Sequence, residues 1–101
     1  MDYREKVYKA VSSIPNGRVS TYKEIACALG DPNLARAVGN ALNKNPDPAK
    51  VPCYRVVKSD GSIGGFKWGL QEKIRLLSLE GIIVKKEKVV GFKELMHKPR
   101  I

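Results

Sequence analysis

The amino-acid sequence predicts an α+β fold that is mostly helical, a winged helix-turn-helix with a small β hairpin. Apolar residues recur at helical spacing in several segments, and a tight glycine-containing turn joins two short ones. A later stretch has the pattern of a strand, an Asp-Gly turn and a glycine-rich return. The chain has 101 residues, 43% of them hydrophobic, which suits one modest core. We therefore expect a single domain over residues 1–101.

The first predicted helix covers residues 2–13, and the turn at residues 14–18 closes it. A second helix begins at Thr21, which forms a capping box with Glu24, and ends at Gly30. The apolar positions expected to face the core are Val7, Ala10 and Val11 in the first helix, Ile14 directly after it, and Tyr22, Ile25, Ala26 and Leu29 in the second helix.

The third predicted helix completes a helix-turn-helix. Asp31 is its N-cap, Pro32 is its first residue, and the segment runs to about residue 44. Two short helices with a cationic outer face on the second are typical of this motif, although other helix pairs in small bundles look similar. The expected inward residues are Leu34, Val38, Ala41 and Leu42, and the expected outward ones are Arg36, Asn40, Asn43 and Lys44.

The sequence predicts less regular secondary structure for the second half of the chain than for the first. A proline-rich loop at residues 44–50 precedes a strand, turn and return over residues 54–66, which form a hairpin or wing. Residues 70–81 predict a helix that turns Ile74 and Leu77 inward, has Leu70 and Leu76 as further candidates for that face, and ends at a glycine. Residues 82–90 predict a strand or a short hairpin.

The net charge indicates a polyanionic partner. Lysine and arginine number 19 against 10 acidic residues, giving a formal charge of +9 and a pI near 9.8. Cations placed on phosphates release condensed counterions, so nucleic acid is the natural partner, although a lysine-rich soluble surface has the same composition. The basic tail, with Lys93, Lys98 and Arg100, fits extra phosphate contacts and plain solvation equally well.

Nothing in the sequence indicates secretion, membrane insertion or metal binding. Residues 1–10 are charged, and no apolar run approaches about 18 residues, so we expect a cytoplasmic protein without membrane contact. Two cysteines in a reducing compartment favour free thiols, and together with one histidine, His97, they make no recognisable zinc set. We expect a monomer, because no heptad pattern or long apolar edge is present.

The stretch "VPCYRVV" at residues 51–57 sets Cys53 between a proline and a tyrosine. A thiolate is a strong nucleophile at saturated carbon, and it forms when nearby positive charge, a base or a helix N-terminus lowers the thiol pKa. A lone cysteine between valines is otherwise a small buried hydrophobic residue. The residues by themselves leave both interpretations open.

Several segments resemble a known family. "GRVSTYKEIA", "ARAVGNAL", "NP", "VPCYRVVKSDGSIGGF" and "LLSLEG" follow in this order between Pro15 and Gly81. Together they resemble the C-terminal DNA-binding domain of the O6-alkylguanine-DNA alkyltransferases, repair proteins that take an alkyl group from guanine onto their own cysteine. The resemblance needs no gap between Thr21 and Gly81, so several motifs keep their separations.

The resemblance implies that Cys53 is the alkyl acceptor and that Glu80 is the carboxylate which orients a neighbouring histidine. Here Tyr54 stands in place of that histidine. A phenol with a pKa of about 10 is a weak base near neutrality, but it can hydrogen-bond Glu80 and a bridging water. Because general-base help is typically worth ~10²–10⁴-fold, the substitution implies a slower reaction.

Further roles follow from the same resemblance. Asn45 ties the helix-turn-helix to the active-site loop, and Tyr22 helps to rotate the nucleotide and donates to guanine N3. Arg36 enters the base stack when the damaged nucleotide leaves it, since a stacked base cannot reach a buried thiol. Solvation of Arg36 and close helix packing are the alternative explanations. The remaining residues implied at the DNA surface are Thr21, Tyr22, Asn40 and the small residues Ala35, Ala37 and Gly39.

The implied base pocket lies under a lid at residues 62–67. Val56 recognises the base by its shape and through backbone carbonyls, while Arg55 orders the site. Phe66, Lys67 and Trp68 depart from the tyrosine and small polar residue of many members, which reshapes the space for the alkyl group. The residues implied to line this pocket are Arg55, Val56, Gly64, Gly65, Phe66 and Lys67.

Three functions fit the sequence. The favoured one is stoichiometric transfer of an alkyl group from O6-alkylguanine in double-stranded DNA to Cys53, with no cofactor and no metal. The second is that of an alkyltransferase-like sensor, which binds the lesion and recruits nucleotide excision repair. This chain is closer in length to such proteins than to many alkyltransferases, but they lack the acceptor cysteine. A winged-helix transcription factor leaves Cys53, Asn45 and Glu80 at their family spacing unexplained.

Overall fold

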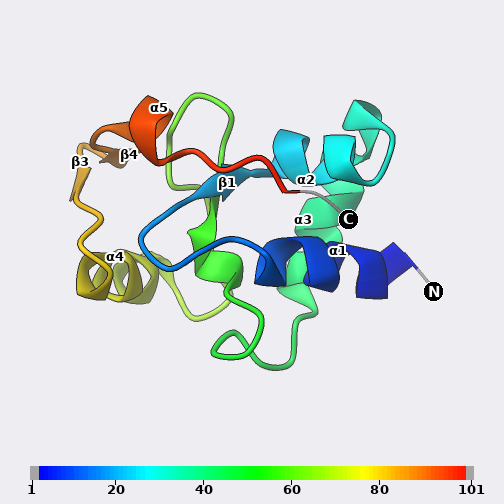
Figure 1. The fold of residues 1–101 in the computed structure, drawn as a ribbon. Coiled ribbons are helices and arrows are strands. Elements are labelled where there is room, and N and C mark those ends of the chain that lie inside the picture. The colour runs from blue at the N-terminus through cyan, green and yellow to red at the C-terminus, as the bar shows by residue number, and fades with distance from the viewer. Residues whose placement is uncertain (1–2, 100–101) are drawn as a thin grey trace.

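The structure is a computed structural model and describes residues 3–99, so Arg100 of the basic tail lies outside the described part. It confirms a mostly helical α+β fold (Figure 1). In chain order its elements are α1 (Tyr3–Ser12), β1 (Ser20–Thr21), α2 (Tyr22–Ala28), the 3-10 helix η1 (Pro32–Leu34), α3 (Ala35–Asn43), the 3-10 helix η2 (Cys53–Arg55), β2 (Val56–Val57), α4 (Leu70–Leu79), β3 (Val84–Lys85), β4 (Lys88–Val89) and α5 (Phe92–Leu95).

Two hydrophobic clusters form the core, and Figure 1 shows the elements around them at opposite ends of the molecule. The first lies between α1, α2 and α3 and contains Cys53 and Val56. The second lies under α4 and the β3–β4 hairpin and contains Val57 and Leu77. Because Val56 and Val57 are consecutive residues of a strand, their side chains point to opposite faces and join the two clusters.

The helix-turn-helix forms with the predicted caps. Thr21 Oγ1 accepts from the Glu24 N–H at 3.0 Å, and Gly30 takes a left-handed conformation with φ of +103° after α2. Asp31 caps the next segment by accepting from the Asn33 N–H at 2.9 Å. This segment begins as the tighter helix η1, and the α-helical part starts only at Ala35.

A short parallel ladder places the second half of the chain against the helix-turn-helix. β1 pairs with β2, with Ser20 opposite Val56 and Thr21 opposite Val57. Since β1 leads directly into α2 and η2 leads directly into β2, this ladder brings Cys53 beside the helix-turn-helix.

The predicted hairpin at residues 54–66 differs in its pairing. A tight turn does form, with the Lys58 N–H donating to the Ser62 carbonyl at 2.8 Å. The return segment, however, bonds to the β3–β4 hairpin: the Ile63 N–H donates to the Glu87 carbonyl at 2.9 Å, and Ser62 bridges to Lys88. The antiparallel hairpin is therefore β3–β4, where the sequence allowed either a strand or a short hairpin.

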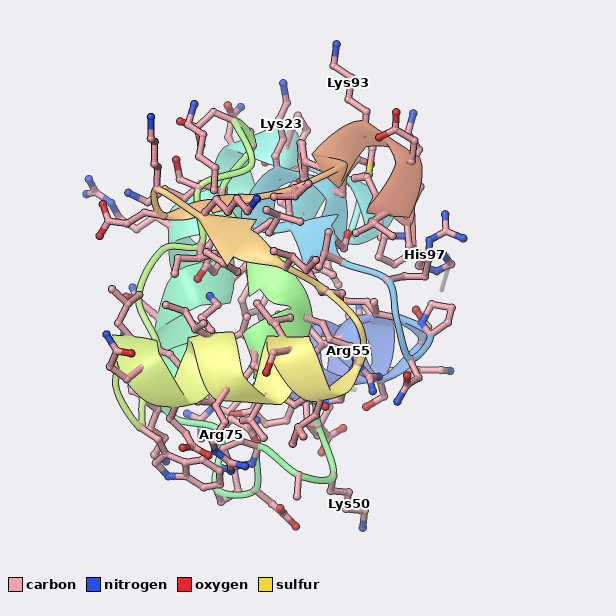
Figure 2. All side chains as sticks on the ribbon, turned by 90° about the vertical axis from the view of Figure 1, so that its left-hand side faces the viewer. Lys23, Lys50, Arg55, Arg75, Lys93 and His97 are labelled. Atoms are coloured by element: carbon pink, nitrogen blue, oxygen red, sulfur yellow. The ribbon has the colours of Figure 1, made fainter. Side chains whose placement is uncertain are left out.

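Charged side chains project in many directions from this fold. In Figure 2, Lys23, Lys50 and Lys93 point away from the body of the protein, whereas Arg55 lies near its centre. None of the helices within residues 3–99 is long and apolar enough to cross a bilayer. Over the same part of the chain, no group of His, Cys, Asp and Glu side chains is arranged to hold a metal ion.

Candidate active site and DNA interface

Cys53 is the first residue of η2 and is buried, with 6% of its surface exposed. Its backbone N–H donates to the Val51 carbonyl at 2.7 Å. The residue lies at the wall of a small cavity between α3 and the predicted lid. This cavity is lined by Tyr22, Gly39, Leu42, Asn43, Cys53, Gly65, Phe66 and Lys67.

The cavity is too small for a purine in this conformation. Its free volume is about 20 Å³, which is room for about one water molecule. Phe66 covers it and makes edge-to-face contacts with Tyr54 and Trp68, with ring centroids 6.4 and 5.9 Å apart. A flipped base can therefore enter only when the Phe66 side chain moves.

Burial raises the pKa of the Cys53 thiol above its usual value. A hydrogen bond with the Asn45 side chain and the positive charges of Lys73 and Lys67 lower it, but burial outweighs them. The positive charge on Cys53 thus comes from two lysines, whereas Arg55 is paired with Glu80. The thiol is consequently the main form at neutral pH.

Lys73 is a residue of this site that the sequence analysis missed. Its surface is 0% exposed, and its Nζ donates to the Val56 carbonyl at 2.8 Å and the Gly65 carbonyl at 3.1 Å. Burial lowers the pKa of Lys73 to about 8. One sequence signal was available, because Lys73 stands four residues before Leu77 and so shares the inward face of α4.

Asn45 connects the end of α3 to the cysteine segment, as the resemblance implied. The residue is fully buried. Its Nδ2 donates to the Val51 carbonyl at 2.9 Å, and its Oδ1 accepts from the Asp47 N–H at 3.1 Å. Its own backbone carbonyl accepts from Lys67 Nζ at 2.7 Å, so Asn45 also holds one side of the lid.

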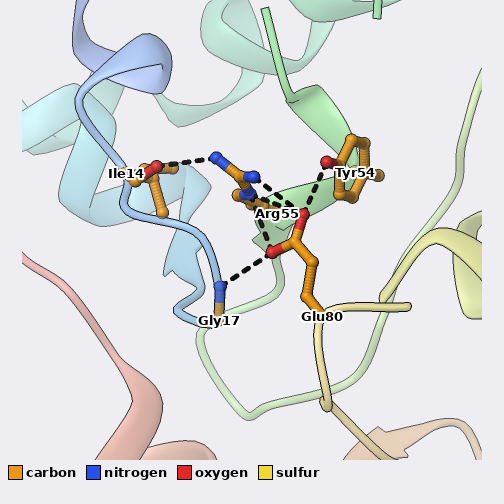
Figure 3. Close-up of polar contacts among 5 residues, drawn as sticks. All are labelled: Ile14, Gly17, Tyr54, Arg55 and Glu80. Atoms are coloured by element: carbon orange, nitrogen blue, oxygen red, sulfur yellow. Dashed lines mark hydrogen bonds and ion pairs between the residues drawn. The ribbon is translucent and has the colours of Figure 1, made fainter. Parts of the chain in front are cut away.

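Glu80 lies at the centre of a partly buried ionic network (Figure 3). The Arg55 guanidinium donates to both carboxylate oxygens, at 2.7 Å in the shortest contact, and also to the Ile14 carbonyl at 2.9 Å. The Gly17 N–H donates to Oε1 at 2.9 Å. Burial raises the pKa of Glu80, but the hydrogen bonds from Arg55, Tyr54 and Gly17 outweigh it and hold this pKa below its usual value.

Tyr54 belongs to the same network. Its hydroxyl donates to Glu80 Oε2 at 2.6 Å, which is the hydrogen bond anticipated from the sequence. Burial, together with this bond to a carboxylate, raises the pKa of Tyr54 to about 12. The phenol therefore stays protonated near neutral pH, with its proton directed at Glu80, and does not act as a base for Cys53.

The outer face of α3 carries the residues implied at DNA. Arg36 and Asn40 are exposed, and the small residues Ala35, Ala37 and Gly39 next to them are partly exposed. Thr21, by contrast, is 3% exposed and its hydroxyl caps α2, so its contact with DNA stays a prediction. The Tyr22 ring lies against Gly39, where an added Cβ would be 3.9 Å from it.

A hollow of about 310 Å³ extends this face toward α1. It brings two cationic residues, Arg4 and Lys44, beside Asn40. Lys44 was expected to face outward, but Arg4 was not singled out because α1 reads as a plain amphipathic helix. The residues that line the hollow are Tyr3, Arg4, Ala37, Asn40, Ala41 and Lys44.

Residues 2–82 match the family model described as "6-O-methylguanine DNA methyltransferase, DNA binding domain". The chain belongs to this family. It is 48% identical over 79 residues to a methylated-DNA--protein-cysteine methyltransferase of Methanosarcina barkeri, covering 78% of this chain and 50% of that protein. It is 46% identical over 82 residues to a bifunctional methyltransferase/endonuclease of Picrophilus torridus, covering 81% of this chain and 28% of that one. The chain thus spans half or less of these two relatives.

Two solved structures resemble this member of the family closely. The crystal structure of S. pombe Atl1 in complex with damaged DNA containing O6-carboxymethylguanine has a TM-score of 0.85 and 38% identity, covering 95% of this chain and 94% of that one. Mycobacterium tuberculosis OGT in complex with DNA has a TM-score of 0.77 and 42% identity, covering 80% of this chain and 49% of that one.

Proposed function

We propose that this protein binds O6-alkylguanine in double-stranded DNA and removes the alkyl group by a single transfer to Cys53. The observation that carries the proposal is the position of Cys53. The thiol is buried at the wall of a cavity formed by α3 and the lid, and Asn45 and two lysines act on it. Core packing alone would not account for a cysteine with this cavity and these polar neighbours.

In the proposed encounter, α3 enters the minor groove. The exposed Arg36 fills the gap that the flipped nucleotide leaves in the base stack, and the small residues around it allow close approach. The damaged base displaces the Phe66 side chain and reaches Cys53, with Tyr22 beside it. Burial, and then the nearby Cys53, raise the pKa of Tyr22, so its phenol remains a hydrogen-bond donor for guanine N3.

In the proposed transfer, the thiol of Cys53 loses its proton and Sγ attacks the alkyl carbon. The new S–C bond forms as the C–O6 bond breaks, and the bonding electron pair leaves with O6. The guanine anion takes up one proton, so the overall change is thiol and O6-alkylguanine to thioether and guanine. The thioether is stable, and Cys53 is consumed.

We expect this reaction to be slow. The raised pKa of the Cys53 thiol keeps the thiolate scarce, and Tyr54 holds its proton against Glu80 rather than accepting one. The rate should rise with pH, by about tenfold per unit while the thiol remains the main form. A proton-accepting group at position 54 would reduce this dependence.

The deciding experiment is intact-protein mass spectrometry after mixing with a duplex that carries one O6-methylguanine. The expected result is the gain of one methyl group on Cys53 over a long incubation, with a faster gain at higher pH. Cys53→Ala is the matched control and should gain nothing. No mass change in a protein that binds the lesion tightly would exclude transfer.

That outcome would favour the second candidate, a lesion sensor that recruits nucleotide excision repair. Two observations favour it independently: the Tyr54 proton faces Glu80, and the similarity to Atl1, solved with damaged DNA, extends over 95% of this chain. Both candidates require tighter binding to alkylated DNA than to plain DNA. Equal binding to the two would contradict both.

A further inference from the structure

The lid presents a lysine to the cavity that contains Cys53. Lys67 lines this cavity together with Phe66 and Cys53. Its Nζ donates to the Asn45 carbonyl at 2.7 Å, and the Asn45 side chain in turn hydrogen-bonds Cys53. The ammonium group is therefore held at the cavity by a specific contact, although much of the Lys67 side chain is exposed.

Positive charge dominates the surroundings of Cys53. Lys67 acts on the thiol from the lid, and the buried Lys73 acts on it from α4. No Asp or Glu is found among the described residues that line the cavity, and the nearby Glu80 is paired with Arg55. Burial opposes any charge here, but the two cations and the absence of a carboxylate in the wall favour an anionic group electrostatically over a neutral group with the same burial.

The alkyl group of a bound substrate must lie in this cavity. Attack requires the alkyl carbon to come within about 3–3.5 Å of Sγ, so any substituent on that carbon faces the other walls. Lys67 forms part of one of these walls. An ammonium group has three donors, and the contact with Asn45 uses one of them, which leaves donors for an anionic substituent.

We propose that Lys67 makes this site selective for O6-alkylguanines whose alkyl group ends in an anion, such as a carboxylate, over neutral alkyl groups of the same shape. The inference rests on the proposed binding of O6-alkylguanine and names the substrate class for it. The chemistry of transfer is unchanged, because Sγ attacks the same carbon. The selectivity acts on binding, through a charge-assisted hydrogen bond.

The test compares three duplexes of one sequence that carry guanine, O6-carboxymethylguanine or O6-carbamoylmethylguanine at one position. The last two have the same shape, and only the acid is charged. Equilibrium binding is measured in the Cys53→Ala background, so that transfer does not consume the lesion. We expect the acid to bind about three- to tenfold more tightly than the amide, and this ratio to shrink at high salt.

Three substitutions assign the selectivity. Lys67→Met keeps the length of the side chain and removes the charge, so the ratio of acid to amide binding should fall close to one. Lys67→Arg should keep a ratio above one, because it keeps a cation at the lid. Lys93→Met removes a charge on α5, which does not line the cavity, and should either weaken binding to all three duplexes equally or leave it unchanged.

The outcomes separate this inference from the proposed function. If neither lesion binds more tightly than guanine, the proposed function fails and the inference fails with it. If both lesions bind more tightly than guanine but equally, the proposed binding of O6-alkylguanine stands and the selectivity is refuted. A preference for the acid that persists in Lys67→Met would refute the role of Lys67.

Discussion

At the level of single residues, the direction of the Tyr54 hydrogen bond has the largest chemical consequence. Tyr54 donates to Glu80, and Glu80 also accepts from Arg55 and Gly17. An imidazole in this position could donate to the carboxylate through one nitrogen and accept a proton through the other. A phenol has one proton and, with a pKa of about 12, no comparable basicity at neutral pH.

We therefore predict that Tyr54→His accelerates methyl transfer to Cys53. The expected gain is about 10²-fold, the lower end of what general-base help contributes. Single-turnover mass spectrometry with an O6-methylguanine duplex measures it. Tyr54→Phe is the matched control: it should leave the rate within a few-fold and lower the unfolding free energy by about 1 kcal/mol, through the lost hydrogen bond to Glu80. A large rate loss in Tyr54→Phe would show that the phenol takes part in catalysis.

Lys73 gives a second prediction, on the dependence of stability on pH. The pKa of Lys73 in the folded protein is about 8, below the 10.5 of an exposed lysine. Above pH 8 the folded state therefore loses this proton while the unfolded state keeps it, so stability rises with pH in this window. From pH 7 to pH 9 the wild type should gain about 1 kcal/mol relative to Lys73→Met.

Urea unfolding at the two pH values, carried out on both proteins, measures this difference. Using the difference between the two proteins removes the contribution of other titrating groups. A parallel change in the two proteins would mean that Lys73 titrates normally and that its ammonium is not buried in solution.

At the level of elements, α3 and the start of α1 share the proposed DNA surface. Arg36 is exposed on α3, and the proposal has it fill the base stack, whereas Arg4 and Lys44 line the hollow between the two helices. We predict that Lys44→Ala weakens binding to alkylated and plain duplexes by the same factor, and reduces the salt slope by about one. Arg36→Ala should instead reduce the preference for the alkylated duplex, because only a flipped base leaves a gap to fill.

Fluorescence anisotropy titrations over a range of salt concentrations separate these two effects. Lys85→Ala, on the β3–β4 hairpin, is the matched control and should leave both the affinity and the salt slope nearly unchanged. An equal loss on both duplexes in Arg36→Ala would indicate a simple phosphate contact.

The elements also show which features are local enough to predict from sequence. The caps at Thr21 and Asp31 depend on residues two or three positions away, and both form as predicted. The pairing of Ile63 with Glu87 joins segments that are distant in sequence, so the strand pattern alone could not identify its partner.

The sequence predicted those residues of the candidate site that lie in recognisable motifs. Cys53, Asn45 and Glu80 were found through matched segments, and the structure brings Cys53 and Asn45 together. Lys73 was missed because a lysine on a helix is normally solvated. Its burial is explained only by the carbonyls of Val56 and Gly65, which the fold brings to it.

At the level of the whole molecule, Glu80 holds the two ends of the fold together. It follows α4 on one side of the molecule, and its carboxylate binds Gly17 in the turn after α1. Arg55 extends the link to the Ile14 carbonyl, which belongs to the same turn. The Glu80 side chain is 5% exposed and that of Arg55 is 13% exposed, so the pair is shielded from water.

We predict that Glu80→Gln lowers the unfolding free energy by about 2–4 kcal/mol, because it removes the negative charge that is paired with the partly buried Arg55. The pKa of Glu80 is lowered in the folded state, so its contribution is present above the unfolded pKa and is lost as the pH falls through the folded one. Glu80→Gln should therefore lose less stability than the wild type on acidification. Urea unfolding followed by far-ultraviolet circular dichroism and by Trp68 fluorescence tests both points. If the two signals change together in the wild type but separately in Glu80→Gln, this carboxylate makes the two ends of the fold unfold as one unit. An unchanged urea midpoint in Glu80→Gln would show that the pairing of β1 with β2 is enough to hold the two ends together.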